Sequence, residues 1–344
     1  MPEEMQPMIR LNRRLLLAGS ATLALPSFRI ASAQSPARLT VALGYAPNVE
    51  MFGPLYAVRA GFFAAEGLTV NAVPASTGVD QVQMVAAGRA DIGIVGPEQI
   101  IAGAGRGEKF RIFAAQYQRS PVCMTARRDS GLTNPSQLPG RPIAVKIPAQ
   151  TFFELFMRKN GLRPDQVTVT PIGRTDVATI ISGRVHAMIT TFAFNEPRSI
   201  EMAGVPVNLM PLAQYGMNAQ TNSYFTQERA FADPAKRDVL VRYLRAEAKA
   251  WQEYFKDPAA AAKWIIDQKF IDGLDLDQQV FLARGQADHM RSALTAERGL
   301  MWVDPAIYRE TATNLQLSGV TSTVIDTDAM LSTEILERAG MPRI

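Results

Sequence analysis

Aromatic and amide side chains follow the first expected strand at a spacing suited to holding a flat polar solute. Tyr45 and Asn48 come after an alternating segment, 39–44, that ends in glycine. An aromatic ring can stack on a flat molecule, and an amide can both donate and accept hydrogen bonds. The alternative for Asn48 is a loop residue that satisfies its own turn. The pair predicts a binding site for a flat polar solute.

Two expected helix starts add candidate ligand contacts to the same half of the chain. Ser76 and Thr77 precede a helix over 79–87 whose free N–H groups could bind an anion, and either residue could instead serve only as the helix cap. Gly96 offers the same geometry before a helix that begins at Pro97. Glu98 would repel an anion there and suits an amine donor, unless it only stabilises the helix dipole.

Residues 119–227 offer equivalent positions at strand ends and helix starts. Glu196 could accept a hydrogen bond from a ring amine or cap its own helix. Arg119 and Arg174 are the cationic candidates for an acidic ligand, because arginine forms bidentate pairs with carboxylate or sulfonate. The remaining candidates lie at the start of the helix 151–160 and after the strand 186–192, and they are Gln150, Thr151, Thr190, Thr191 and Asn195.

Residues that could support catalysis or bind metal are few. The chain has one cysteine, Cys123, and two histidines, His186 and His289. One cysteine excludes an intramolecular disulfide and a cysteine-rich metal site, and two histidines disfavour structural zinc. No acid is arranged with His289 as a catalytic triad. We therefore expect a protein without catalytic residues, metal or cofactor.

Two distant stretches repeat one pattern of helix, glycine, buried strand and acidic helix start. The first begins at Gly88-Arg89-Ala90-Asp91 and the second at Gly183-Arg184-Val185-His186. Two similar α/β units predict two lobes, each a mostly parallel sheet flanked by helices. Ligands of open α/β sheets bind outside the carboxyl ends of the strands, so the cleft between the lobes is the expected site.

The alternation of elements predicts how the chain divides. We expect residues 36–118 and 228–344 to form lobe 1 and residues 119–227 to form lobe 2, with the strand 223–226 returning to lobe 1. The two crossings would form a hinge that permits closure around a ligand. From 234 to 316 the chain is expected to be helical, with an apolar stripe that packs on a lobe and comprises Leu240, Leu244, Trp251 and Phe255.

The first 33 residues have the order of a cleavable secretory signal. Arg13-Arg14 precede an apolar run too short to span a membrane, and the small-residue site Ala31-Ser32-Ala33 follows. The paired arginines favour the twin-arginine route. No cysteine lies in or just after this segment. We therefore expect cleavage after Ala33, no lipid anchor, no stable membrane insertion, and a location in the periplasm.

Composition describes an ordinary globular protein. The 344 residues can hold about two domains, and the hydrophobic and charged contents are 47% and 20%. Four arginines and two glutamates precede residue 34, so removing that segment lowers the formal net charge of +4 to about +2. No Arg/Lys-rich stripe is present, and we expect no nucleic-acid partner.

Several short motifs occur in an order that covers most of the mature chain. They are Pro47-Asn48, Leu55-Tyr56-Ala57, Gly61-Phe62-Phe63, Glu66-Gly67-Leu68-Thr69-Val70, Gly88-Arg89-Ala90-Asp91-Ile92-Gly93, Leu138-Pro139-Gly140-Arg141 and Asn195-Glu196-Pro197. This order resembles the alkanesulfonate/nitrate/taurine-type substrate-binding proteins of ABC transporters, including the branch similar to thiamine-pyrimidine synthase. The resemblance implies the type II periplasmic binding protein fold. It also implies a monomeric receptor that passes a small-molecule solute to an ABC permease and its ATPase, with the Asn-Glu-Pro turn beside the ligand.

Departures from the synthase branch bear on function. That branch tends to have histidine before the glycine region that Gly53 occupies and relies on a cysteine cluster, whereas Met51 and Phe52 precede Gly53 here and no histidine occurs before His186. A pyrimidine-forming enzyme is therefore disfavoured as an alternative, and a periplasmic ligand sensor stays open. The aromatic and amide side chains favour an aromatic or heterocyclic solute over nitrate, and an organic anion is also retained.

Overall fold

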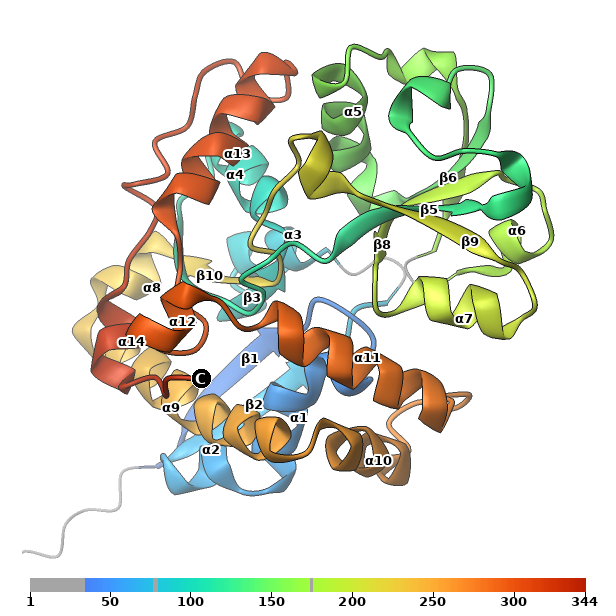
Figure 1. Cartoon of the computed structure of the whole chain (residues 1–344). Helices are drawn as coiled ribbons and strands as arrows, with labels where there is room; N and C mark the ends of the chain where they lie inside the picture. The colour runs from blue at the N-terminus through green and yellow to red at the C-terminus, as the bar shows by residue number, and fades with distance from the viewer. Residues whose placement is uncertain (1–34, 77–79, 174–175) are drawn as a thin grey trace, which may run out of the picture. The chain divides into compact units, whose positions relative to one another are not determined.

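Two five-stranded sheets organise the part of the chain that the computed structural model describes, residues 35–76, 80–173 and 176–344 (Figure 1). The first sheet has the strand order β2-β1-β3-β10-β4 and the second has the order β7-β6-β8-β5-β9. The first contains β1 (Ala37–Ala42), β2 (Leu68–Val73), β3 (Ile92–Val95), β4 (Phe110–Ala115) and β10 (Ser223–Gln227). The second contains β5 (Val122–Arg127), β6 (Pro142–Lys146), β7 (Thr168–Ile172), β8 (Ala187–Phe192) and β9 (Val207–Pro211).

One strand of each sheet runs against its neighbours. β10 is antiparallel to β3 and β4, and β5 is antiparallel to β8 and β9, whereas the other paired neighbours are parallel. Both sheets are therefore mostly parallel, as predicted. The strands that follow the two glycine motifs, β3 and β8, hold the same place in the two orders. Gly88 and Gly183 turn the chain into them with φ of 70° and 78°, a conformation that favours glycine.

The chain crosses between the sheets twice, from β4 to β5 and from β9 to β10. β10 pairs with β3 and β4, so residues 223–227 belong to the first sheet. The last strand of the second sheet along the chain is β9.

Helices flank both sheets. Those that precede β10 are α1 (Phe52–Arg59), α2 (Phe62–Ala65), α3 (Gln81–Ala86), α4 (Pro97–Gly105), α5 (Gln150–Lys159), α6 (Ala178–Ile181) and α7 (Glu196–Met202). The C-terminal helices are α8 (Glu228–Ala232), α9 (Pro234–Lys256), α10 (Pro258–Gln268), α11 (Leu276–His289), α12 (Ala293–Arg298), α13 (Pro305–Leu317) and α14 (Glu334–Ala339). Short 3-10 turns are η1 (Val49–Met51), η2 (Arg128–Ser130), η3 (Pro135–Gln137), η4 (Ile147–Ala149), η5 (Pro164–Gln166) and η6 (Leu212–Tyr215).

The cap expected before the third helix is wrong. α3 begins at Gln81, and the side chain of Asp80 accepts a hydrogen bond from the backbone N–H of Gln83 at 3.0 Å. An aspartate at this position satisfies one of the free N–H groups of the helix, so no cap from Ser76 is needed. Thr77 lies outside the described residues.

The long helix α9 packs its predicted apolar stripe onto the first sheet. Leu240, Leu244 and Trp251 are buried, and Phe255 is half-buried against the same core. Gly53 in α1 allows the close approach of the Trp251 indole, because a Cβ at residue 53 would lie 2.3 Å from the ring. The indole ring therefore joins α1 to α9.

The C-terminal helix α13 contacts the second sheet's helices as well as the first's. Ala312 and Leu315 share a buried cluster with Phe153 of α5. The Lys159 ammonium also donates to the Asn314 side-chain oxygen at 2.6 Å. α13 therefore contacts both α4 and α5.

Within the described ranges, no helix is long and apolar enough to cross a membrane. The expected signal segment, 1–33, and its cleavage site lie outside those ranges.

Candidate functional site

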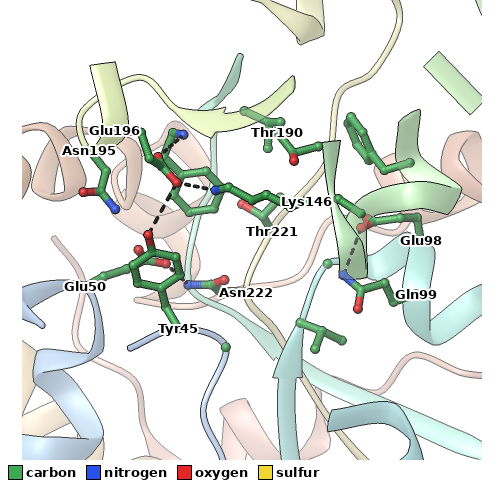
Figure 2. A pocket seen from close by; sticks show the side chains of 17 residues that line it. Tyr45, Glu50, Glu98, Gln99, Lys146, Thr190, Asn195, Glu196, Thr221 and Asn222 are labelled. Carbon is green, nitrogen blue, oxygen red and sulfur yellow. Dashed lines mark hydrogen bonds and ion pairs between the residues drawn. The ribbon is translucent and has the colours of Figure 1, made fainter. Parts of the chain in front are cut away.

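A cavity of about 90 Å³ lies between the two sheets, at the edge where their parallel strands end (Figure 2). We call it the central cavity. The turns after β1, β3, β6 and β8 and the start of β10 meet here, as the carboxyl-end rule requires. The described residues that line it are Gly44, Tyr45, Glu50, Val95, Gly96, Glu98, Gln99, Val122, Lys146, Ala149, Phe152, Thr190, Phe192, Asn195, Glu196, Thr221 and Asn222.

A buried ion pair occupies one side of the central cavity. Lys146, the last residue of β6, donates from its ammonium to Glu196 Oε1, and the side chains are 9% and 4% exposed. Glu196 Oε2 accepts from the backbone N–H of Phe192 at 2.8 Å, and the Tyr45 hydroxyl lies 3.5 Å from Oε1. The Tyr45 ring also faces the ammonium, with its centroid 5.8 Å from Nζ. Tyr45, which follows a strand of the first sheet, thus contacts the Lys146–Glu196 ion pair of the second sheet.

A second carboxyl group lines the cavity at the start of α4. Glu98 is buried, and burial raises its pKa above the ordinary value of 4.5, against smaller lowering effects of its backbone hydrogen bond and of Gln99. The carboxyl group folds back over Gly96, where a Cβ would lie 2.3 Å from Oε1. Glycine at residue 96 is therefore required for this placement. Burial disfavours the charged form of a carboxyl group, which is the cause of this shift.

A buried amide binds a third carboxylate where the chain crosses between the sheets. The Asn222 side-chain amide donates to Glu50 Oε1 and to Gln116 Oε1, both at 3.1 Å. Asn222 has a φ of 54°, in the left-handed region that asparagine tolerates better than most residues. The crossing is thereby fixed against the floor of the central cavity.

A larger groove adjoins the central cavity and shares Tyr45 and Asn195 with it. We call it the outer groove. Its volume is about 730 Å³, and it runs between the first sheet's loops, the 271–275 segment and α7. Its described lining includes Asn48, Ser76 and Gln278.

The structure brings most of the predicted site residues to these two hollows. Asn48 and Ser76 lie on the outer groove. The Asn48 side-chain oxygen accepts from the Glu50 backbone N–H at 2.9 Å, which is the local turn role given as its alternative. Those on the central cavity are Tyr45, Gly96, Glu98, Thr190, Asn195 and Glu196.

Four predicted residues lie elsewhere, and their expected placement is corrected. Thr191 points to the opposite face of β8, because strand side chains alternate, and its hydroxyl lies 2.6 Å from that of Thr125. The Arg119 guanidinium is turned outward to donate to the Asp288 carbonyl at 2.6 Å. Gln150 is exposed and donates to Glu154 one helical turn later. Thr151 lies in the same turn, which presents Ala149 and Phe152 to the cavity instead. Thr77 and Arg174 lie outside the described residues.

Several lining residues were not predicted as ligand contacts. Lys146 could have been predicted from the sequence, since it ends a buried strand at the edge of the sheet where ligands bind. The sequence contains no pattern that would predict Glu50, Thr221 and Asn222, because only the crossing of distant segments brings them to the cavity.

The sulfur of Cys123 is not part of the site. Cys123 is fully buried in the second sheet beside Thr191, and burial raises its pKa to about 11. Among the described residues, no group of three or more His, Cys, Asp or Glu side chains could hold a metal ion.

Two mixed sheets with a cavity at their facing strand ends define the class of the protein, which is the periplasmic binding protein fold. Residues 48–261 match the NMT1/THI5-like family, and the chain belongs to that family. The resemblance drawn from the motifs is thereby confirmed.

Named relatives and solved structures are similar along most of the chain. Riboflavin-binding protein RibY of Chloroflexus aurantiacus is 26% identical over 87% of this chain and 86% of its own length. A formylaminopyrimidine-binding protein of Halalkalibacterium halodurans is 24% identical over 70% of this chain and 73% of its own length. The alkanesulfonate-binding protein SsuA of Xanthomonas axonopodis pv. citri, solved bound to MOPS, has a TM-score of 0.63 at 14% identity, with 87% and 99% covered. The desulfurization enzyme DSZB shares the fold too, with a TM-score of 0.56 at 14% identity and 88% and 99% covered.

Proposed function

We propose that the protein is the solute-binding component of an ABC importer and that it holds an uncharged nitrogen heterocycle in the central cavity. The charge balance of the cavity carries this proposal. Lys146 is the one cation among the described residues that line it, and its ammonium is bound to Glu196. A sulfonate or nitrate would need a cation of its own, because burying an unpaired charge is costly.

The polar groups of the cavity suit a neutral ring with hydrogen-bonding edges. Glu98 is a buried carboxyl group with a raised pKa, Glu196 can accept a hydrogen bond, and the Tyr45 ring offers a face. Relatives named for binding riboflavin and a formylaminopyrimidine support a heterocycle as the solute class.

The size of the cavity implies movement. A volume of about 90 Å³ is below the roughly 300–1,000 Å³ of most ligand pockets. We propose that the first and second sheets, with their helices, act as two lobes that separate to admit the solute and close on it. The two segments that cross between the sheets would act as the hinge for this motion.

We further propose that the protein binds its solute without transforming it. The Cys123 thiol lies outside the central cavity and is held as the thiol by its raised pKa, so it offers no thiolate nucleophile. Delivery to a permease and its ATPase, a monomeric state, and a periplasmic location after signal cleavage belong to the same proposal.

A thermal-shift measurement on the full chain tests the solute class. The probes are riboflavin, formylaminopyrimidine, MOPS and nitrate. A probe at a hundred times its Kd adds about 2.7 kcal/mol of stability, so its binding raises the unfolding midpoint. We expect at least one heterocycle to raise it and the two anions to leave it unchanged.

Two variants make the test specific to the cavity. Glu98→Leu removes a polar lining group and should weaken heterocycle binding, whereas Arg119→Met alters an exposed residue outside the cavity and should not. A larger shift with MOPS or nitrate than with either heterocycle would contradict the proposed solute class.

A further inference from the structure

The side-chain amide of Asn195 is held with one end in use and the other end unpartnered. Asn195 is 5% exposed, and its Oδ1 accepts from the Gln278 amide nitrogen at 2.8 Å. Its Nδ2 is buried without a hydrogen-bond partner. Figure 2 shows this nitrogen turned toward Tyr45, with the oxygen turned away. A buried donor without a partner is costly, so this group requires an explanation.

In this orientation the Asn195 side chain does not cap the helix that follows it. Asn195 precedes the first residue of α7, a position where asparagine usually accepts from a helix N–H, yet its side chain makes no such bond. The amide is instead placed on the walls of both the central cavity and the outer groove.

A chain of amides fixes which end of Asn195 faces the cavity. The backbone N–H of Val49 donates to Gln279 Oε1 at 3.0 Å, and a backbone N–H can only donate. The other end of the Gln279 amide, Nε2, therefore donates to Gln278 Oε1. Gln278 Nε2 must then donate to Asn195 Oδ1, which leaves Asn195 Nδ2 as the outward donor.

We propose that Asn195 is a specificity-determining donor for an unprotonated ring nitrogen or a carbonyl oxygen of the bound heterocycle, and that Gln278 and Gln279 are the positioning residues that set its direction. This inference rests on the proposed function. It adds that the solute carries a hydrogen-bond acceptor on the edge that meets Asn195, because a solute without one would leave the buried donor unpaired.

The amide chain also joins the two halves of the protein. It starts at η1, passes through two neighbouring residues of α11, and ends at the turn between β8 and α7 of the second sheet. The Gln278 and Gln279 side chains are 7% and 1% exposed, so water does not replace these bonds in the described conformation. The donor is therefore directed only when α11 and α7 are in contact.

Substitutions at Gln278 test the direction without touching the lining of the central cavity. In Gln278→Glu, a carboxylate can only accept, so Asn195 must turn its nitrogen toward residue 278 and its oxygen toward the cavity. Gln278→Met keeps the approximate volume and leaves the Asn195 amide without a fixed direction. Gln227→Met is the matched control, since this amide binds the backbone of Val85 and Ala86 in the first sheet.

Binding is measured by titration with riboflavin or formylaminopyrimidine, whichever raises the midpoint of the parent chain. An acceptor facing an acceptor costs about tenfold or more in affinity. We expect Gln278→Glu to lose more than Gln278→Met, although the glutamate retains more hydrogen bonds. A purely structural role would give the reverse order. Asn195→Asp should lose at least as much as Gln278→Glu, and Gln227→Met should bind like the parent.

A ligand-free measurement separates failure of this inference from failure of the proposed function. The ¹⁵N–¹H signal of the Asn195 side-chain amide should shift in Gln278→Glu because the NH₂ group gains a partner. An unchanged signal overturns the amide chain whatever the protein binds. A shifted signal with no heterocycle bound by the parent chain supports the chain and rejects the proposed solute. Equal affinities of the parent and Gln278→Glu overturn the role of Asn195 as donor.

Discussion

At the scale of single residues, Lys146 and Glu196 decide the charge of the central cavity. Removing two charges from water is expensive, and the cost is offset only when their remaining hydrogen-bonding groups are satisfied. Glu196 meets this condition through the Phe192 N–H and the nearby Tyr45 hydroxyl. It also begins α7, where a negative charge is favourable. The pair is therefore a fixed feature of the cavity wall.

Breaking this pair on one side should destabilise the protein more than removing both charges. Lys146→Met leaves the Glu196 carboxylate buried without its counter-charge, and we expect the free energy of unfolding to fall by about 3 kcal/mol. The double variant Lys146→Met, Glu196→Gln removes the uncompensated charge and should recover most of that loss. Urea unfolding of the full chain at neutral pH measures both values.

An exposed ion pair supplies the control for this experiment. Lys249 pairs with Glu66 at 3.1 Å, with the lysine side chain 45% exposed. Lys249→Met should change stability by less than about 1 kcal/mol, because solvent screens such a pair. A double variant at the cavity that is no more stable than Lys146→Met alone would show that the loss comes from packing and not from the unpaired charge.

At the scale of elements, a buried carboxyl group joins α9 to β10. Glu247 Oε1 accepts from the Tyr224 hydroxyl at 2.6 Å and from the Trp251 indole N–H at 2.9 Å. Glu247 is fully buried, and burial raises its pKa from 4.5 to about 7 despite these hydrogen bonds. The contact between α9 and the first sheet therefore includes a buried carboxyl group with a raised pKa.

The stability of the fold should fall as pH rises through this range. Unfolding returns Glu247 to an ordinary pKa, so between pH 4.5 and about 7 the native state holds a proton that the unfolded state has lost. Stability contributed by the protonated group is complete below pH 4.5 and is lost as pH rises to about 7. The loss is about 3 kcal/mol for a shift of this size.

The variant Glu247→Gln should remove this component of the pH dependence. Urea unfolding between pH 4.5 and 8 compares it with the parent chain, and Glu253→Gln, a more exposed acid in the same helix, serves as the control. The difference in stability between Glu247→Gln and the parent should grow with pH and level off above about 7. A difference that stays constant across this range would contradict a raised pKa.

At the scale of the whole molecule, the order of elements was predictable and the direction of side chains was not. Helix and strand positions follow from local patterns, such as the glycines that precede β3 and β8. The site depends on finer geometry. Thr190 reaches the central cavity with a φ of 62°, whereas its neighbour Thr191 faces the sheet core. Strand alternation predicts that the side chains of Thr190 and Thr191 point to opposite faces of the sheet. The pattern of apolar residues does not predict which of the two faces a cleft.

Contacts between distant segments could not be predicted from the sequence either. The contacts between Asn195 and α11 and between α13 and α5 join residues that are far apart in the sequence. No local signal marks their partners. These same contacts decide how the two halves meet, so the parts of the protein that sequence patterns describe least are those that would control closure.

Gly285 provides the test of closure for the whole molecule. It lies in α11, and a Cβ there would be 2.3 Å from the Phe194 Cβ in the turn before α7. In Gly285→Ala the added methyl group should separate α11 from α7, which opens the central cavity and breaks the bond from Gln278 to Asn195. Alanine is also the better helix former by about 1 kcal/mol, so the stability of the ligand-free chain should change little.

Binding and stability should therefore respond differently to this change. We expect the affinity for the heterocycle that binds the parent chain to fall about tenfold or more, while the free energy of unfolding in urea stays within about 1 kcal/mol. Arg284→Ala, at the exposed neighbouring position of α11, should alter neither value. If Gly285→Ala binds as tightly as the parent, contact between α11 and α7 is not part of the ligand-bound state. If instead it unfolds far more readily, Gly285 serves the core and not the closure of the two halves.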